Sequence, residues 1–422
     1  MPVLLPGKLL PLSLHSYLVW CLVGYGIIGL FVLTRPISPI RSVVNAAEHE
    51  LCSSSLVALP TIAPLIFLLV WLSVNLWSSA DRITSWIAIG YLLFGIVLYM
   101  WGVSAASLLF YQTHLPLGIT LIGTTLALIL PLIVIWKPQF RLFYLPLYDR
   151  LQTIQLDIGE TVHPNILAGV LVLTVPTALS LFAWQSTYQR LRYLQLGLLI
   201  STIVQLSVLI LSQSRGGYLA LTAAMVTMLL LRWPRLIYLL PVVMVSIALL
   251  TRSIGWTTIL DQFSSDSALG GWSGRLEIWQ TSLMAIANFP FTGIGIGTFT
   301  TVIPLLYPLS FPIESYPHAH NLFLQVALDL GIPGLIAYIA LLINLFAMLF
   351  VTLRKAPRHT MVHTLAIGAT GSLVGMITHG MLDAVTWGTK LSFIPWLLFA
   401  LITQLFLQVQ QPEPVTDQLQ PL

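Results

Sequence analysis

The sequence predicts an all-α, polytopic integral membrane protein. Of its 422 residues, 57% are hydrophobic and only 8% are charged, and the mean hydropathy is +0.91. A soluble core could not absorb this much apolar surface. Apolar runs of about 18 residues or more recur along the chain, and each can cross roughly 30 Å of hydrocarbon. The pattern therefore predicts about ten to twelve transmembrane helices.

The segments expected to span the membrane follow one another with short polar breaks. They are residues 17–34, 57–78, 84–110, 115–136, 163–184, 193–212, 216–231, 236–251, 331–353, 361–382 and 389–408. The first is expected to be retained, because no small-residue cleavage site follows Lys8 and its apolar run. Residues 1–408 are expected to form one membrane domain, followed by a disordered cytoplasmic tail over 409–422 that is rich in Gln and Pro.

Basic residues in short loops predict which ends of the spans face the cytoplasm. Three such loops hold Arg190 and Arg192, Arg232 and Arg235, and Arg354, Lys355 and Arg358. The alternation of spans then places Arg215 and the long segment 252–319 on the outer side. The loop 137–162 also falls outside, although it carries Lys137, Arg141 and Arg150. Either a span is miscounted in the first half or this loop departs from the rule.

Two arginines stand in this outer region. Arg215 lies in a polar turn, Ser212 to Tyr218, between two apolar spans. An arginine at a span end most often reaches for water, but Gly216 and Gly217 would let the backbone approach a ligand and add amide donors. Arg275 begins a segment that predicts an amphipathic helix on the membrane surface, ending near Pro290. The expected apolar face consists of Leu276, Trp279, Leu283 and Ile286. The helix dipole disfavours a cation at that start, which indicates either a binding role or a solvated charge.

A second outer motif is Pro317-His318-Ala319-His320-Asn321, which precedes a short apolar helix, Leu322–Leu330. Gly331-Ile332-Pro333-Gly334 is expected to break this helix before the next span. Histidine can accept a proton near neutral pH, so His320 is a candidate general base. A metal site would use His318, His320 and Glu314, but the spacing fixes no third ligand, and no metal is predicted.

Other polar motifs carry weaker expectations. His379 and Asp383 lie one turn apart near the outer end of a late span, and they either serve function or bond each other. His359 and His363 have the same spacing, but they fall on the cytoplasmic side and are expected to be interfacial. Gly293-Ile294-Gly295-Ile296-Gly297 lacks the strand–helix context of a nucleotide site, so it predicts a turn where the loop folds back.

Together these motifs resemble the O-antigen ligase family of bacterial membrane glycosyltransferases, which includes O-antigen polymerases and protein O-oligosaccharyltransferases. The resemblance covers residues 160–400, and its strongest element is His320-Asn321 followed, after nine residues, by Gly331-Ile332-Pro333-Gly334. The supporting elements are Ser214-Arg215-Gly216-Gly217, Gly274-Arg275-Leu276-x-x-Trp279, Pro290-x-x-Gly293-x-Gly295-x-Gly297-x-Phe299 and His163-Pro164-Asn165-x-x-Ala168.

The resemblance implies a GT-C-like enzyme of lipopolysaccharide or polysaccharide biosynthesis, with its active site on the periplasmic side of the bacterial inner membrane. Its donor would be a glycan on undecaprenyl pyrophosphate, and its acceptor a hydroxyl on a lipid, sugar or protein. His320 matches the proposed general base, and Arg215 and Arg275 match the arginines that hold the pyrophosphate. Supporting residues would be His318, Asn321, Asp383, His379 and Asn165. Two guanidiniums can bind phosphate in a bidentate manner, so no cofactor or metal is expected.

Two alternatives remain open at this point. A polymerase of a repeat-unit glycan or a protein O-oligosaccharyltransferase would differ only in the acceptor. A small-solute transporter, for example one for inorganic carbon, would keep ionisable residues along a midplane pathway with broken helices and repeats. Here the notable polar groups gather on one face, which favours glycan transfer. The scattered net charge of +4 argues against a nucleic-acid partner, and Cys21 and Cys52 form no disulfide or zinc pattern.

Overall fold

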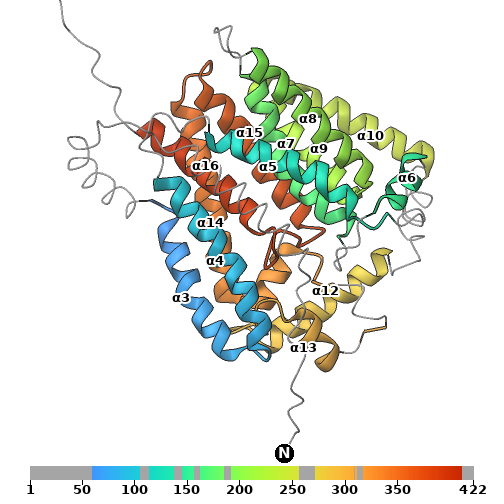
Figure 1. Ribbon diagram of the computed structural model, residues 1–422, viewed down its shortest axis with the longest axis vertical. Coiled ribbons are helices and arrows are strands. Elements are labelled where there is room, and N and C mark those ends of the chain that lie inside the picture. Colours follow the sequence, from blue (N-terminus) through green and yellow to red (C-terminus); the bar gives the residue numbers. More distant parts are fainter. Residues whose placement is uncertain are drawn as a thin grey trace, which may run out of the picture.

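The computed structural model describes residues 59–104, 114–136, 145–155, 162–184, 192–255, 271–307, 309–310 and 317–410, and this part of the chain is built from helices (Figure 1). The helices are α3 (Ile62–Ser78), α4 (Arg82–Ser104), α5 (His114–Ile129), α6 (Leu147–Thr153), α7 (Pro164–Ala183), α8 (Arg192–Ser212), α9 (Arg215–Arg232), α10 (Leu240–Ile254), α12 (Gly271–Asn288), α13 (Phe299–Leu306), α14 (Leu322–Lys355), α15 (Met361–Gly380) and α16 (Phe393–Gln410). Short 3-10 turns follow α5 and precede α10. The predicted all-α class is confirmed.

The helices also confirm a polytopic membrane protein. Among the described residues, 8 helices are long and apolar enough to span a bilayer: α4, α5, α7, α8, α10 with its preceding turn, α14, α15 and α16. The helix α3 is apolar but shorter. Each expected span from residue 57 onward coincides with a helix, while the expected span 17–34 and most of the expected tail lie outside the described residues.

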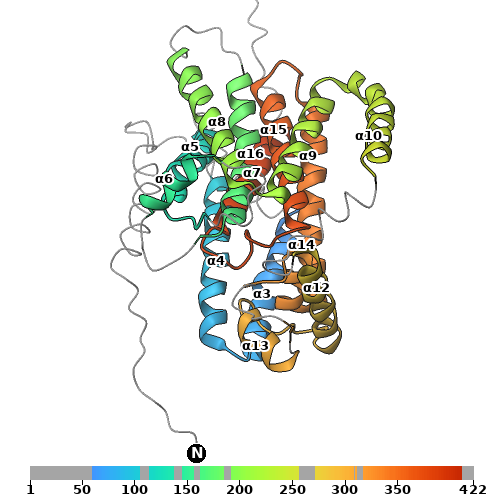
Figure 2. The same ribbon diagram turned by 90° about the vertical axis from the view of Figure 1, so that its right-hand side faces the viewer.

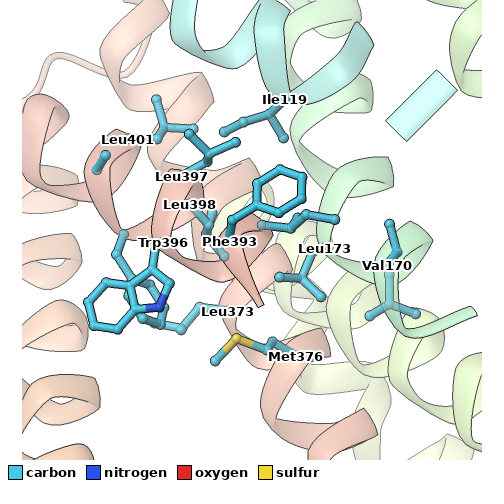
Figure 3. Close-up of a cluster of buried hydrophobic side chains, with 14 of the residues drawn as sticks. Ile119, Val170, Leu173, Leu373, Met376, Phe393, Trp396, Leu397, Leu398 and Leu401 are labelled. Atoms are coloured by element: carbon cyan, nitrogen blue, oxygen red, sulfur yellow. The ribbon is translucent and has the colours of Figure 1, made fainter. Parts of the chain in front are cut away.

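The core of the bundle forms around α7, which is buried over most of its length and packs against α5, α8, α9 and α15. A second packed region joins α16 to α4, α14 and α15. Figure 3 shows Phe393 and Leu397 of α16 among Ile119, Leu173 and Met376 from α5, α7 and α15. Lipid tails are as apolar as these side chains, so close packing, and not exclusion from water, holds such helices together.

In contrast, α10 makes few contacts with the bundle, and none of its candidate span is buried. Figure 2 shows it standing beside α9, away from the other helices. A helix that is apolar and uncovered in this way presents its side chains to the bilayer.

The helix α14 is broken where the sequence predicts it. Gly331 has φ 73° and ψ −179°, which interrupts the helix after Leu330. A Cβ on Gly331 would lie 2.2 Å from the backbone oxygen of Phe291, and the N–H of Ile332 donates to the Pro290 oxygen at 2.7 Å. Only glycine combines a positive φ with this close approach. The short segment before the break, Leu322–Leu330, is thereby joined to the loop that follows α12.

That loop contains the three glycines, and it folds back as predicted. Gly293, Gly295 and Gly297 have φ values of 67°, 105° and 78°. The N–H of Ile294 donates to the Leu328 oxygen at 2.8 Å, and the N–H of Ile296 donates to Asn75 Oδ1 at 3.0 Å. The amides of the two isoleucines are thus used inside the protein, between α14 and α3.

The predicted helix around Arg275 is confirmed as α12, and its expected apolar face meets the protein in part, because Ile286 is buried and Trp279 packs against buried residues. Leu276 and Leu283 are 40% and 56% exposed, whereas Ile278 and Ala285 are buried. The buried side packs toward α14. A helix between protein and membrane carries apolar side chains on more than one face, so their spacing alone does not identify the face that points inward.

Contacts of the loop residues identify the two ends of the bundle. Arg232 at the end of α9 donates to the Arg358 oxygen before α15 at 3.5 Å, and Lys355 at the end of α14 donates to Gln410 of α16 at 2.8 Å. The loop with Arg232 and the loop with Lys355 and Arg358 therefore lie at the same end of the bundle. Both loops are expected in the cytoplasm. Tyr148 of α6 donates to the Leu211 oxygen at 2.8 Å, which places α6 and its Arg150 at the other end, while Lys137 and Arg141 lie outside the described residues. Arg150 therefore lies at the end of the bundle where the alternation of spans predicts it.

Candidate active site

Four helix ends meet at the end of the bundle opposite Arg232: the starts of α7, α9 and α14 and the end of α15. A Cβ on Gly217 of α9 would lie 2.7 Å from the Cβ of Ala168 on α7, so these two helices are in close contact. A Cβ on Gly380 would lie 3.0 Å from Leu322 at the start of α14. The chain thus brings segments from its middle and its C-terminal third to one place.

Each of the three helices that begin here has a side-chain cap. His163 Nδ1 accepts from the Asn165 N–H at 3.2 Å, and Ser214 Oγ accepts from the Gly217 N–H at 3.1 Å. Asn321 Oδ1 accepts from both Phe323 and Leu324 at 3.0 Å. Caps of this kind satisfy amides that the helix leaves without partners. The Gly217 amide therefore serves Ser214, which corrects the expectation that it offers a donor to a ligand.

Asn321 has a second role, because its Nδ2 donates to the Met381 oxygen at 3.1 Å. This bond ties the start of α14 to the turn after α15. The predicted supporting residue Asn321 is thus a cap and a connector between two elements of the site.

The centre of the site is the carboxylate of Asp383, which is only 3% exposed. His318 Nε2 lies 3.2 Å and His320 Nδ1 lies 3.4 Å from Asp383 Oδ1. Asn165 Nδ2 donates to Asp383 Oδ2 at 3.0 Å, and the Ala384 N–H donates to Oδ1 at 2.9 Å. The carboxylate therefore joins the His-x-His loop to the start of α7.

The backbone of His320 is held in an unusual conformation. Its φ is 48°, in the left-handed region that residues other than glycine seldom adopt. Its N–H donates to His318 Nδ1 at 3.2 Å, and the two imidazole rings lie 4.4 Å apart. Residues kept in such conformations often occur at functional sites, where the surroundings hold them.

Electrostatics fix the charges of this group. Burial, and next to it the electrostatic interaction with His320, lower the pKa of His318 to about 3, although Asp383 acts in the opposite direction. His318 is therefore neutral at physiological pH. Burial by itself would raise the pKa of Asp383, but its electrostatic and hydrogen-bond interactions with His320 and His318 hold that pKa well below its ordinary value. Asp383 is therefore ionised.

The predicted pairing of His379 with Asp383 is present in the backbone. The Asp383 N–H donates to the His379 oxygen at 2.9 Å. The His379 ring is buried beside α7 and α9, within 2.9 Å of a Cβ placed on Gly169 and 3.9 Å of one placed on Gly216. Its Nε2 has no hydrogen-bond partner among the residues that the structure describes.

The two arginines lie at the same end as the histidines. The positive charge of Arg275 acts on both His318 and His379. Arg215 is exposed at the start of α9, and the next residue, Gly216, approaches Leu382 and His379. Contacts thus join His318, His320 and Asn165 to Asp383, whereas Arg275 is linked to this group only through its charge.

The site also contains a set of metal ligands that is feasible by geometry. His318, His320 and Asp383 can each offer one ligand atom, and these atoms lie within 4.8 Å of one another. Asp383 is a third ligand that spacing in the sequence did not identify, and Glu314, the one considered, lies outside the described residues. The same three groups also form a hydrogen-bonding cluster of two imidazoles and a carboxylate.

Sequence reasoning missed a buried group behind the His-x-His loop, namely Gln325, Asp329 and Trp387. Trp387 Nε1 and Gln325 Nε2 both donate to the Asp329 carboxylate, each at 2.9 Å. A signal was available, because a single acid inside an apolar run is a functional candidate by default.

Comparison with known families agrees with this site. Residues 199–339 match the family model described as O-antigen ligase, a stretch that contains Arg215, Arg275 and His320. No curated protein matches the chain. The family expected from the sequence is thereby confirmed. The match supports a multi-pass membrane glycosyltransferase of the O-antigen ligase or polymerase type, a family that uses a lipid-linked glycan donor and an acceptor within a membrane.

Proposed function

We propose that this O-antigen ligase family protein transfers a glycan from undecaprenyl pyrophosphate to an acceptor hydroxyl, without a metal ion, at the periplasmic face of the bacterial inner membrane. The site lies at the end of the bundle opposite Arg232 and Arg358, and basic loops favour the cytoplasm. We assign the membrane domain to residues 1–408, with the periplasmic segment 252–319 supplying Arg275 and His318.

His320 is the proposed general base. Asp383 faces its Nδ1 at 3.4 Å, so Nε2 is the nitrogen that takes the proton of the acceptor hydroxyl. A carboxylate at Nδ1 favours the tautomer that is basic at Nε2 and stabilises the imidazolium that forms. Asp383 is suited to this role because it stays ionised, with its pKa held below the ordinary value by the neighbouring histidines.

Arg215 and Arg275 are the proposed pyrophosphate ligands. The bond between the anomeric carbon and the phosphate oxygen breaks, and its electron pair leaves with undecaprenyl pyrophosphate. This leaving group needs stabilisation of negative charge, which guanidinium groups supply through paired hydrogen bonds. The starts of α7, α9 and α14 add the positive ends of three helix dipoles at the same place.

The reaction is balanced by these groups alone. The acceptor oxygen forms the new glycosidic bond as its proton moves to His320, and the pyrophosphate departs on the opposite side of the anomeric carbon. An in-line displacement of this kind inverts the configuration at that carbon. A product linkage with retained configuration, observed by NMR, would contradict the single displacement.

The break in α14 is a feature that transporters also use. In transporters, however, ionisable groups line a path at the midplane. Here His318, His320 and Asp383 contact one another at one end of the bundle. Glycan transfer accounts for this cluster, whereas solute passage leaves it unexplained.

The observation that carries the proposal is the contact of His320 with Asp383 beside three helix starts. The test measures transfer from an undecaprenyl-pyrophosphate glycan by purified protein in detergent. His320→Ala should lower the turnover number by about 10²- to 10⁴-fold, the usual contribution of a general base. The matched control is His359→Ala, an exposed histidine at the opposite end, which should keep wild-type turnover. Full transfer by His320→Ala would remove this residue from the mechanism.

The arginines are tested separately, with Arg232→Ala at the far end as the control. Arg275→Ala and Arg215→Ala should weaken donor use more than the corresponding lysine variants, because lysine keeps the charge but not the planar fork. Wild-type activity in either alanine variant would exclude that arginine as a pyrophosphate ligand.

A further inference from the structure

A buried polar chain connects both halves of the candidate site, and its residues have no part in the chemistry described above. Its centre is the carboxylate of Asp329, a buried side chain in the last turn before the break of α14. Asp329 Oδ1 accepts from Gln325 Nε2 at 2.9 Å, and Oδ2 accepts from Trp387 Nε1 at 2.9 Å. The Gly297 N–H also donates to this carboxylate.

The first arm of the chain reaches the His-x-His loop. Gln325 Oε1 accepts from the N–H of Ala319 at 2.7 Å, and Ala319 is the residue between His318 and His320. An amide side chain has one acceptor end and one donor end. Asp329 accepts from the donor end, so the oxygen of Gln325 is turned toward Ala319.

The second arm reaches the turn that contains Asp383. Trp387 is buried, and its backbone N–H donates to the Ala384 backbone oxygen at 3.2 Å. The N–H of Ala384 donates in turn to Asp383 Oδ1 at 2.9 Å. Asp329 is therefore linked through Gln325 to the loop that carries His320, and through Trp387 to the turn that carries Asp383.

We infer that Asp329 and Gln325 are positioning residues that hold His320 against Asp383. The inference rests on the proposed function, since it concerns the same base. The left-handed φ of His320 persists only if the surroundings fix it, and the bond from Ala319 to Gln325 fixes the residue directly before it. Loss of this bond would let the loop relax, and a displacement of about 1 Å at a catalytic group can lower a rate by about 10²-fold.

The first experiment compares two buried glutamines. Gln325→Met removes the acceptor of the Ala319 N–H while keeping a side chain of similar length. The matched control is Gln404→Met on α16, because Gln404 is as buried as Gln325 and donates to the Gly102 oxygen. We expect the turnover number of Gln325→Met to fall about 10²-fold, with the KM for the donor within about twofold of wild type, whereas Gln404→Met retains wild-type turnover. An unchanged turnover in Gln325→Met would overturn the inference, and so would a loss confined to KM.

The second experiment exchanges the two groups. Gln325→Glu alone places two carboxylates side by side, and Asp329→Asn alone can turn the glutamine away from Ala319. In the double variant Q325E/D329N, the carboxylate introduced at position 325 accepts from Ala319 and from the new asparagine amide, which leaves the asparagine oxygen for Trp387. We expect the turnover number of the double variant to be at least about tenfold higher than that of Gln325→Glu. A double variant that is no more active than either single variant would refute the relay, even if Gln325→Met fails to fold.

A third measurement does not depend on glycan transfer. Diethyl pyrocarbonate modifies accessible, neutral imidazoles, and mass spectrometry locates the modified residue. Gln325→Met should increase modification of His320 relative to wild type, whereas Gln404→Met should not. An increase together with full transfer by His320→Ala would show that the relay exists while the proposed base is wrong. No increase, together with inactive His320→Ala, would show that the relay is wrong while the base stands.

Discussion

The buried imidazole of His318 predicts how the protein responds to acid. Its pKa is lowered from an ordinary value of 6.5 to about 3, first by burial and then by the charge of His320. Between these values the unfolded chain binds a proton that the folded protein does not. The free energy of unfolding therefore falls as the pH drops below 6.5. At about pH 5 the difference amounts to about 2 kcal/mol, whereas at about pH 7.5 it is close to zero.

The change that tests this is His318→Asn, because Asn Oδ1 can still accept from the His320 N–H in place of His318 Nδ1. Unfolding by sodium dodecyl sulfate in mixed micelles, followed by far-UV circular dichroism, would compare the two pH values. The wild type should lose about 2 kcal/mol more than His318→Asn on going to the lower pH. Asp383 does not contribute, since its pKa lies well below its ordinary value and it stays ionised at both pH values. Exposed His359 provides the control as His359→Asn, which should follow the wild type. Equal acid losses in the wild type and His318→Asn would refute the assignment of a buried, neutral imidazole.

Three further outcomes are expected. Asp383→Asn should lower turnover by about 10²- to 10⁴-fold in the same transfer assay, since the carboxylate that orients His320 is lost, and wild-type turnover would argue against the pair. Gly331→Ala should lower the free energy of unfolding by about 1–3 kcal/mol, because its Cβ would meet the Phe291 oxygen at 2.2 Å. Gly90→Ala should not lower the free energy of unfolding, because nothing lies within 4 Å of the added Cβ. Equal effects of the two changes would contradict the role given to Gly331. Transfer measured after treatment with EDTA or phenanthroline should stay within about twofold of the untreated rate, and a loss restored by Zn²⁺ would instead indicate that His318, His320 and Asp383 hold a metal.

The sequence was sufficient to predict the spans from residue 57 onward, but not the short helix α6, which lies in an expected loop. Apolar length identifies the spans, and Gly331 marks the break in α14 because a positive φ is a local property of the backbone. The fold-back at Gly293–Gly297 could be predicted for the same reason. Local chemistry did not identify which face of α12 is buried, since that depends on α14, a distant part of the chain.

In the candidate site, too, local features could be predicted from the sequence, whereas contacts between distant residues could not. The sequence singled out His320 and Asp383 individually, because polar groups are conspicuous in an apolar chain. It could not pair them, and it left open whether Asp383 and His379 serve function or bond each other. The pair forms because the turn after Gly380 directs the carboxylate away from its own helix, toward the start of α14. Gln325 was missed because an amide gives no signal until its two partners are known.

The arrangement also suggests why two histidines surround one carboxylate. Asp383 is ionised, and a pyrophosphate beside it would be repelled if the two anions faced each other across the site. Asp383 is 3% exposed, while the side chains of His318 and His320 are 15% and 13% exposed. The imidazoles therefore cover the carboxylate, and the proposed pyrophosphate ligands Arg215 and Arg275 would supply the positive charge. On this arrangement, neutral His318 separates Asp383 from the proposed donor, while His320 connects Asp383 to the proposed acceptor. Replacing His318 by alanine should then weaken donor binding more than it lowers turnover, the opposite of the split expected for Gln325→Met.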